Sequence, residues 1–162
     1  MVIGTVLSMG DVELRVVDPA ADDAQRCLRA YEAELNERFD AGFDVGSALP
    51  LPADEMRDRA GCFVVAYRDG EAVGCGGLKL HGSDPAEIKR VWVDRSARGL
   101  GLARRLVTEL EDRARAAGAP AVQLDTNRTL TEAIALYRSI GYVEIEPFNE
   151  EPYAHHWFRK DL

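Results

Sequence analysis

The segment from Arg95 to Arg105 combines the residue types that bind anionic groups. It holds four arginines, two glycines and no acidic residue. A β-branched run over 88–93 precedes it and predicts a strand, and a helical pattern begins near Leu100. A glycine-bearing loop that leads from a strand into a helix presents unpaired backbone N–H groups and the positive end of the helix dipole. The sequence therefore predicts a phosphate-binding site at this loop.

The same loop departs from two common phosphate-binding motifs. Gly99 and Gly101 begin the dinucleotide-binding pattern G-x-G-x-x-G, but Arg104 stands in place of its third glycine. The sequence holds no P-loop motif G-x-x-x-x-G-K-S/T and no G-x-S-x-G motif of a nucleophilic serine. The loop therefore does not indicate a Rossmann dinucleotide site or a P-loop nucleotide site, and nothing indicates catalysis through a covalent serine intermediate.

Hydrophobic periodicity predicts the elements that must hold this loop in place. Alternating or β-branched runs predict strands at 12–17, 62–67, 72–80, 86–93, 121–125, 142–145 and 154–160. Apolar spacings of three and four predict helices, with Asp18 capping the first and a Thr129–Glu132 capping box opening the last. The predicted helical segments are 19–39, a short turn at 54–59, 100–117 and 129–140.

The order of these elements predicts the sheet topology. Short turns such as Asp69-Gly70 join the strands at 62–93 into an antiparallel meander. The strand, helix and strand over 86–125 form a β-α-β unit, whose two strands are parallel neighbours with a right-handed crossover. We therefore expect one α/β domain over 1–162 with a loose leader at 1–10. Its sheet is mixed and mostly antiparallel, with about six to seven strands flanked by about four helices.

The composition is that of an ordinary globular protein with an uneven distribution of charge. Hydrophobic residues make up 46% of the chain, and no apolar run approaches the length of a membrane span. The net charge of −8 argues against nucleic acid as a partner. The first 60 residues hold 13 acidic and 6 basic residues, against 15 and 14 in the remainder. This acidic third is either a solvated surface or a means of attracting a cationic substrate.

The cysteines and histidines indicate neither disulfides nor a metal site. Cys27, Cys62 and Cys75 form no C-x-x-C pair, and the first residues lack the basic region of a signal peptide. Reduced thiols in the cytoplasm, with no membrane association, are therefore expected. His155 and His156 are adjacent, so on a strand they point to opposite faces, and no metal is expected.

Motifs around the loop resemble those of one known family. The run Arg98-Gly99-Leu100-Gly101-Leu102-Ala103 matches the pattern Arg/Gln-x-x-Gly-x-Gly/Ala between a strand and a helix. Asn127 and the run from Leu136 to Tyr142, with Tyr137 and Gly141 inside it, follow downstream. With this order of elements, the chain resembles the GNAT superfamily of acyl-CoA-dependent N-acetyltransferases over almost its whole length. The resemblance implies the GNAT fold, a splayed parallel strand pair, and acetyl-CoA as co-substrate.

The resemblance also implies which residues bind acetyl-CoA. Backbone N–H groups hold the pyrophosphate in a loop made of Arg98, Gly99, Leu100, Gly101, Leu102 and Ala103. The backbone of Trp92 and Val93 pairs with the pantetheine arm, and Asn127 matches a position that contacts the pantetheine amides. Asn127 alternatively caps a turn. Arg104 and Arg105 are either exposed helix charges or contacts to a CoA phosphate.

Two side chains match the acid and the base of the family. Tyr137, four residues before Gly141, matches the general acid for the departing thiolate, and is otherwise a core residue. Glu87, six residues before Val93, matches a strand glutamate that serves as general base directly or through water, and is otherwise a solvated charge. Alternation places Glu87 on the face of Val91 and Val93 unless a bulge turns it. Presenting an alkylamine as the free base at pH 7 costs about 4.6 kcal/mol, so the base is expected to matter more than the acid.

The loop before the last strand borders the acceptor pocket in proteins of this fold. The candidate acceptor residues are Tyr31, Phe148, Asn149, Tyr153 and His155. The implied function is acetyl transfer from acetyl-CoA to a primary amine of a small molecule, by direct attack in a ternary complex and without a metal. Acetylation of a peptide or protein N-terminus or lysine would need an open groove, and a CoA-binding sensor without catalysis is a further alternative. A homodimer is compatible with the sequence.

Overall fold

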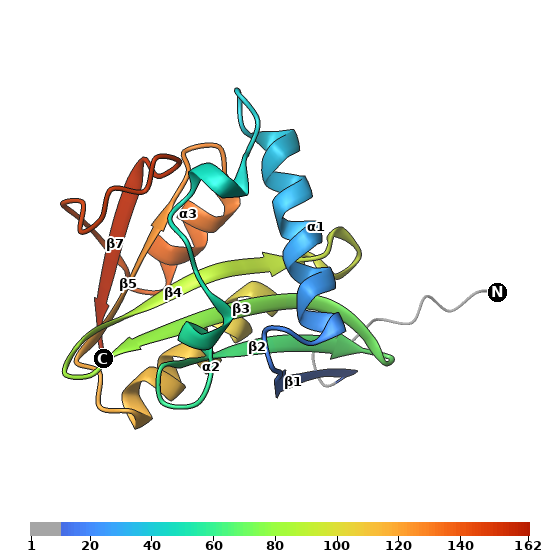
Figure 1. Cartoon of the computed structure of the whole chain (residues 1–162), viewed down its shortest axis with the longest axis horizontal. Helices are drawn as coiled ribbons and strands as arrows, with labels where there is room; N and C mark the ends of the chain where they lie inside the picture. Colours follow the sequence, from blue (N-terminus) through green and yellow to red (C-terminus); the bar gives the residue numbers. More distant parts are fainter. Residues whose placement is uncertain (1–10) are drawn as a thin grey trace.

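Seven strands form one mixed sheet in the order β1-β2-β3-β4-β5-β7-β6 (Figure 1). The computed structural model describes residues 11–162, so the leader expected at 1–10 lies outside the described residues. The strands are β1 (Val12–Val16), β2 (Gly61–Arg68), β3 (Glu71–His81), β4 (Asp84–Val93), β5 (Ala121–Thr126), β6 (Val143–Ile145) and β7 (His156–Asp161). The mixed, mostly antiparallel sheet is as predicted.

Three α-helices flank the sheet within the described residues, where about four helices were expected. They are α1 (Asp22–Arg38), α2 (Leu102–Ala116) and α3 (Thr131–Ser139). The turn expected at 54–59 is a 3₁₀ helix of four residues at Ala53–Met56, too short to form an α-helix.

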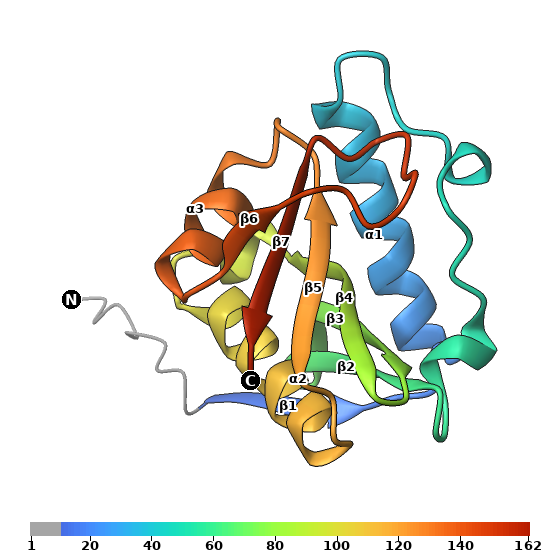
Figure 2. The ribbon, with the colours of Figure 1, turned by 90° about the vertical axis from the view of Figure 1, so that its left-hand side faces the viewer.

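The sheet opens between β4 and β5, its parallel pair. The two strands pair only through Ala86 with Val122 and Glu87 with Gln123, although β4 continues to Val93. On its other edge β5 pairs antiparallel with β7 over six residues (Figure 2). The predicted splay of the parallel pair is therefore present, and it leaves the second half of β4 without a ladder partner on the β5 side.

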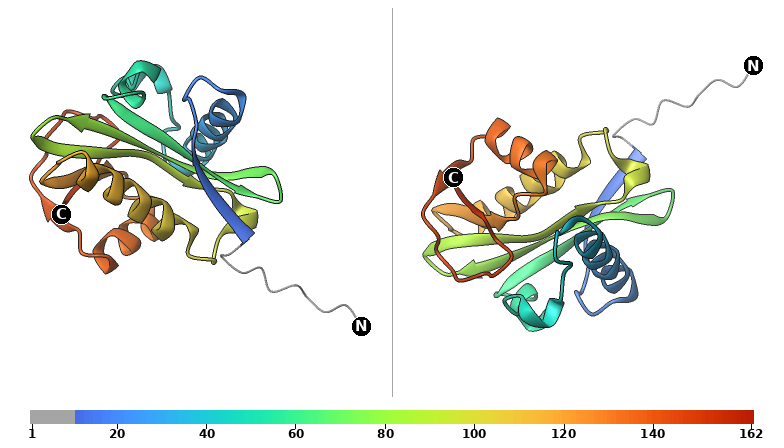
Figure 3. Two further views of the ribbon diagram at one scale, coloured as in Figure 1. Left: turned by 90° about the horizontal axis from the view of Figure 1, so that it is seen from below. Right: turned by 90° about the horizontal axis from the view of Figure 1, so that it is seen from above.

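Helices cover both faces of the sheet. Figure 3 shows α1 on one face and α2 with α3 on the other. The buried core under α2 and α3 includes Ile88, Val93, Leu102, Leu106, Val107, Leu110, Val122, Leu124, Ile134 and Phe158. The core under α1 includes Ala24, Cys27, Met56, Phe63, Val65, Cys75 and Trp92. The α2 helix packs so closely on β3 that a Cβ on Gly76 would lie 2.9 Å from Leu110 Cδ1.

A β-bulge interrupts β4 just beyond the point where β5 leaves it. Cys75 pairs with Trp92 and Gly77 pairs with Lys89, so two residues of β4 lie opposite one of β3. Arg90, inside the bulge, has a φ of 59°, a conformation that non-glycine residues rarely adopt.

This bulge reverses the alternation of side chains along β4. Ile88 and Val93 both pack in the core under α2, whereas Trp92 packs under α1. Glu87 neighbours Ile88 and therefore faces the α1 side, away from Val93. Simple alternation would place Glu87 on the face of Val93, and the bulge between them places it on the opposite face.

The start of α1 differs from the prediction. The helix begins at Asp22, and its N-terminal cap Ala21 makes no side-chain hydrogen bond. Asp18 instead accepts the N–H of Ala20 at 2.8 Å and pairs with Arg57 at 2.9 Å. The Asp18 carboxylate therefore stabilises a turn before the helix. Aspartate side chains often bind nearby backbone N–H groups in this way instead of capping a helix.

The start of α3 also differs. The helix begins at Thr131 after Leu130, so Thr129 is not its capping residue. The Thr129 hydroxyl donates to Asn127 Oδ1 at 2.9 Å, which satisfies the hydroxyl one residue too early for a capping box.

A buried polar contact joins α2 to the C-terminal strands. The Tyr142 hydroxyl donates to Glu111 Oε2 at 2.8 Å, and Lys160 Nζ lies 3.2 Å from the same carboxylate. Glu111 is only 5% exposed. Burial and the neighbouring carboxylate both disfavour the phenolate, so the pKa of Tyr142 is raised well above its usual range. Tyr142 therefore keeps the proton that it donates to Glu111.

Other features of the described residues bear on the expected environment. No helix in residues 11–162 combines the length and the apolar character needed to cross a membrane. Cys27, Cys62 and Cys75 are free thiols, and Cys27 and Cys75 are buried.

Candidate functional site

The predicted anion-binding loop leads from β4 into α2 without side-chain capping. Asp94 accepts the N–H of Ser96 at 2.9 Å and shapes the first turn after β4. Gly101 is the N-terminal cap of α2 with a φ of 74°, and no side chain caps the helix and no acid lies in its first turn. A Cβ at Gly101 would meet no atom within 4 Å, so conformation and not space requires glycine there. The N–H groups at this helix start are available to an anion.

A cavity of about 440 Å³ lies against this loop, between α1 and α3. The predicted cofactor residues that line it are Trp92, Val93, Arg98, Gly99, Gly101, Leu102, Ala103 and Arg104. Leu100 and Asn127 do not line it. The cavity reaches the splayed part of β4 at Val91, so the structure brings the loop and the open strand edge together.

Ion pairs connect α1 to the other walls of this cavity. Arg98 Nε donates to the Val93 carbonyl at 3.0 Å, and its guanidinium contacts the carboxylate of Glu34 on α1. Arg38 of α1 pairs with Glu132 of α3 at 2.8 Å. The Arg98 side chain is thus held by its own strand end and by α1.

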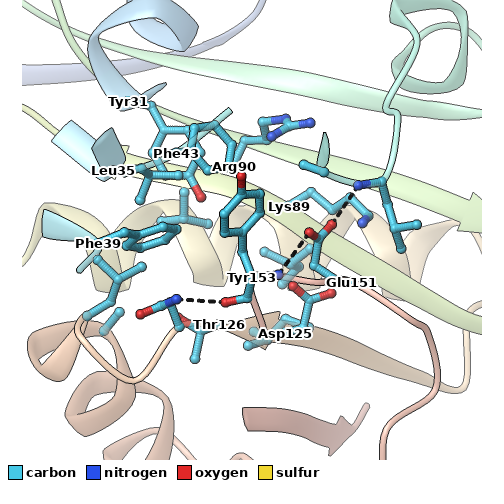
Figure 4. A pocket seen from close by; sticks show the side chains of 18 of the residues that line it. Tyr31, Leu35, Phe39, Phe43, Lys89, Arg90, Asp125, Thr126, Glu151 and Tyr153 are labelled. Carbon is cyan, nitrogen blue, oxygen red and sulfur yellow. Dashed lines mark hydrogen bonds between the residues drawn. The ribbon is translucent and has the colours of Figure 1, made fainter. Parts of the chain in front are cut away.

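A second, smaller cavity of about 100 Å³ shares walls with the first (Figure 4). Two loops cover it, because Glu151 accepts the N–H of Leu49 at 2.9 Å and the Tyr153 hydroxyl accepts the N–H of Asp44 at 3.0 Å. The Tyr153 ring also packs on Phe43, with ring centroids 4.8 Å apart. These contacts join segments 102 and 109 residues apart and close this cavity on the loop side.

Tyr137 and Tyr31 line both cavities. Tyr137 is 6% exposed, and its hydroxyl makes no hydrogen bond with residues 11–162. Burial raises the pKa of Tyr137 well above its usual range, and Tyr31 and Asp125 add to this effect. Burial likewise raises the pKa of Tyr31 to about 12, although the nearby Arg90 opposes it. Tyr137 therefore carries a proton at neutral pH where the two cavities meet.

Four charged side chains line the second cavity: Lys89, Arg90, Asp125 and Glu151. Asp125 Oδ2 accepts a hydrogen bond from Asn149 Nδ2 at 2.8 Å. The Arg90 guanidinium forms no ion pair or hydrogen bond with any residue of 11–162. The cavity thus presents charges of both signs.

Glu87, the predicted base, lies behind the wall of the second cavity. Its Oε1 is 2.9 Å from His81 Nε2, and its Oε2 is 3.5 Å from Lys89 Nζ. Lys89 lines the cavity, whereas Glu87 lines neither of the two cavities. Any action of Glu87 on a ligand there passes through Lys89 or through water.

Asn127 lines the second cavity and not the first. Its Nδ2 donates to the Tyr153 carbonyl at 2.7 Å, and its Oδ1 accepts the N–H of Thr129 at 2.9 Å. Asn127 is 7% exposed, so its amide stabilises the turn before α3 and the loop that carries Tyr153. The turn-capping alternative matches these contacts, and a contact with a cofactor stays a prediction.

The remaining acceptor candidates lie at different distances from the second cavity. Tyr31 and Tyr153 line it, whereas Phe148 and Asn149 do not. Asn149 contacts the wall of the second cavity indirectly, because its Nδ2 donates a hydrogen bond to Asp125. His155 lines a separate hollow, where its Nδ1 accepts the N–H of Arg128 at 3.2 Å. Burial and the nearby Arg128 lower the pKa of His155.

Several residues of the second cavity were not selected from the sequence. They are Phe39, Phe43, Arg90, Asp125 and Glu151. Asp125 carried a usable signal, because it is a charged residue at the end of a predicted apolar strand in a β-α-β unit. Among the described residues, no group of three or more His, Cys, Asp or Glu side chains is arranged to hold a metal.

The fold and the site together define a class of protein. A splayed parallel pair, an uncapped helix start and two cavities that meet at a buried tyrosine occur together in this α/β fold. The chain belongs to the acetyltransferase (GNAT) family, whose family model matches residues 24–142.

Individual relatives agree with this assignment. An IAA acetyltransferase of Azospirillum brasilense is 42% identical over 93 residues, which are 57% of this chain and 60% of that protein. The chain therefore spans less than two thirds of that relative. The uncharacterized N-acetyltransferase YjgM of Escherichia coli K12 is 33% identical over 126 residues, 75% of each chain. The PaiA N-acetyltransferase of Thermoplasma acidophilum, solved in complex with coenzyme A, has the same fold, with a TM-score of 0.72 at 12% identity over 93% of this chain and 99% of that one.

Proposed function

We propose that the chain transfers the acetyl group of acetyl-CoA to a primary amine of a small molecule, by direct attack within a ternary complex. The observation that carries this proposal is the pair of cavities that share Tyr137. One cavity lies beside the uncapped start of α2, and the other is covered by two loops. Two ligands bound together would meet at the Tyr137 hydroxyl.

The larger cavity fits the chemistry of coenzyme A. The free N–H groups after Gly101 suit the pyrophosphate, and Arg104 adds a positive charge at the same place. β4 forms no ladder pairs with β5 beyond Glu87, so its backbone near Val91 suits the amides of the pantetheine arm. Bound acetyl-CoA supplies an activated acyl thioester. The PaiA structure, which shares this fold, is that of a coenzyme A complex.

The proposed reaction assigns proton transfers to two side chains of this protein. The amine nitrogen forms a bond to the thioester carbonyl carbon, and the carbon–sulfur bond breaks. Tyr137 gives its proton to the departing sulfur, and Asp125, in the wall of the second cavity, takes a proton from the amine. Glu87 then contributes as a base only through water or through Lys89, since its own carboxylate does not line the cavity.

The small volume of the second cavity favours a small acceptor over a peptide. A peptide needs an open groove, whereas hydrogen bonds from Asp44 and Leu49 join two loops over a space of about 100 Å³. The name of the Azospirillum relative, IAA acetyltransferase, describes acetyl transfer by that protein and supports the same chemistry here. A cytoplasmic location and a homodimer remain predictions from the sequence.

The test is release of thiol from acetyl-CoA in the presence of primary amines, with peptides that carry a free N-terminus or lysine as a second panel. We expect release with small amines and none with peptides. Release with peptides alone would identify a peptide acetyltransferase. Tight binding of coenzyme A without release in either panel would identify a CoA-binding sensor.

A further inference from the structure

Arg90 is unusual among the arginines of this protein. It is partly buried in the β4 bulge, lines the second cavity and has a φ of 59°. Every other partly buried arginine in residues 11–162 has a hydrogen-bond or ion-pair partner, and Arg90 has none. The guanidinium donors of Arg90 are therefore left for solvent or a ligand, and strained backbone positions of this kind cluster at functional sites. Arg90 is therefore placed to bind an anion.

The bulge directs Arg90 away from the coenzyme A cavity. Arg90 lines the second cavity and a neighbouring hollow that also holds Glu32, with which it forms no ion pair, but it does not line the larger cavity beside α2. The anion that Arg90 would bind is therefore not a phosphate of coenzyme A.

A second charge in the same cavity has no protein counter-charge. Asp125 accepts one hydrogen bond, from Asn149 to its Oδ2, and its Oδ1 has no partner among the described residues. Asp125 and Arg90 form no ion pair with each other, although both line the cavity. Figure 4 shows them on opposite sides of the space, with Tyr153 and Glu151 between them in the view.

The other two charges of the cavity are already engaged. Lys89 Nζ lies 3.5 Å from Glu87 Oε2. Glu151 accepts the N–H of Leu49 with one oxygen and the N–H of Tyr153, at 3.3 Å, with the other. The cavity thus retains one unpartnered cation and one carboxylate oxygen without a partner, held apart across its width.

We propose that the acceptor is a small amino acid, a primary amine that also carries a carboxylate, with Arg90 binding the carboxylate and Asp125 facing the amine. This inference rests on the proposed acetyl transfer and specifies its acceptor. A guanidinium binds a carboxylate through two parallel hydrogen bonds, a geometry that also fixes where the amine lies. A doubly charged phosphate fits less well, because Asp125 and Glu151 line the same small space.

The test compares amino acids with the amines that lack their carboxylate. Thiol release from acetyl-CoA is measured with L-leucine beside 3-methylbutylamine, L-phenylalanine beside 2-phenylethylamine, and 4-aminobutyrate beside butylamine. We expect at least one amino acid to exceed its matched amine about 10-fold or more in kcat/KM, the effect of one charged hydrogen-bonded pair.

The variant for this test is Arg90→Asn, because asparagine tolerates a positive φ and so keeps the bulge. It should lower kcat/KM for the preferred amino acid about 10- to 100-fold, a much larger loss than on the matched amine. Arg90→Lys, which keeps the charge without the fork geometry, should lie between. The control is Arg59→Asn, since Arg59 is an exposed arginine that also lacks an ion pair within the described residues.

Each outcome separates the two proposals. Equal or better turnover of the amines, or an equal loss on both substrates in Arg90→Asn with an unchanged Tm, overturns the amino acid acceptor and leaves acetyl transfer standing. If Arg90→Asn lowers the Tm, the comparison of matched substrates in the unmodified chain decides the question by itself. Absence of thiol release with every acid and every amine overturns the proposed function, and this inference with it.

Discussion

Tyr137 presents a protonated hydroxyl that no group among the described residues accepts. Any tyrosine is protonated at neutral pH, and burial, which raises the pKa of Tyr137, strengthens that preference. Tyr137→Phe keeps the ring packing on Tyr142 and Phe158 and removes only the hydroxyl group. We expect kcat to fall about 100-fold, with little change in the Kd for acetyl-CoA, as measured by thiol release and calorimetry. An unchanged kcat would remove Tyr137 from the proton transfer.

The pH dependence of kcat/KM separates the two carboxylates that are candidates for the base. Asp125 lines the second cavity, whereas Glu87 can act there only through Lys89 or through water. Asp125→Asn should abolish the acidic limb of the pH profile, because no carboxylate then takes the proton directly. Glu87→Gln should retain that limb and lower kcat/KM less. Loss of the limb in Glu87→Gln alone would identify Glu87 as the base.

Residues within continuous motifs were predictable, and those that depend on tertiary geometry were not. Of the ten cofactor residues proposed from the sequence, eight line the larger cavity, and six of these lie in the run from Arg98 to Arg104. The sequence did not single out Arg90 and Asp125, because their places in the second cavity depend on a bulge and on the splay of two strands. Alternation along one strand shows neither feature.

At the scale of elements, the two ends of α2 provide a matched experiment. Gly101 and Gly118 both have positive φ, and a Cβ at either position meets no atom within 4 Å. Alanine at each costs about 1 kcal/mol of backbone strain, which corresponds to roughly 2–4 °C in Tm. Only Gly101→Ala should also weaken the binding of acetyl-CoA, because only that end presents free N–H groups to the cavity. Equal affinity in both variants would mean that the loop does not hold the pyrophosphate.

The elements themselves were predicted better than their ends. Strands were placed correctly because burial on both faces leaves long apolar runs, as in β2, whose interior residues are almost all buried. The caps at Asp18 and Thr129 were misassigned because short polar side chains have other local partners. Whether such a side chain caps a helix or holds a turn depends on neighbours such as Arg57 and Asn127, which sequence spacing does not reveal.

At the scale of the whole molecule, loops that are distant in the sequence meet beside the second cavity. The Tyr153 hydroxyl accepts the N–H of Asp44, 109 residues away. Tyr153→Phe removes this bond and should raise KM for the amine about 5-fold, the effect of roughly 1 kcal/mol, without changing the Kd for acetyl-CoA. Tyr67→Phe is the control. It also loses a hydroxyl group, which donates a hydrogen bond of 2.8 Å to Asp23, but Tyr67 lines neither of the two cavities. A similar rise in KM in the control would point to a general loss of stability.

The contact of Tyr142 with Glu111 and Lys160 holds the C-terminal strands against α2 across the molecule. Because the folded state raises the pKa of Tyr142, its stabilising effect is complete below the unfolded pKa of about 10 and is lost as the pH rises through the folded value. Tyr142→Phe should therefore lower the free energy of unfolding by about 1.5–3 kcal/mol at pH 7.

The alkaline limb of stability tests the origin of this effect. Between pH 7 and pH 10 the difference between the unmodified chain and Tyr142→Phe should stay constant in urea unfolding, and above pH 10 it should shrink, because only the unmodified chain then loses stability through Tyr142. Glu111→Gln keeps a hydrogen-bond acceptor but removes the carboxylate that helps raise the pKa of Tyr142. In this variant the alkaline loss of stability should still begin at the unfolded pKa of about 10, but it should end at a lower pH and be smaller in total. A difference that stays constant above pH 10 would show that the folded state does not raise the pKa of Tyr142.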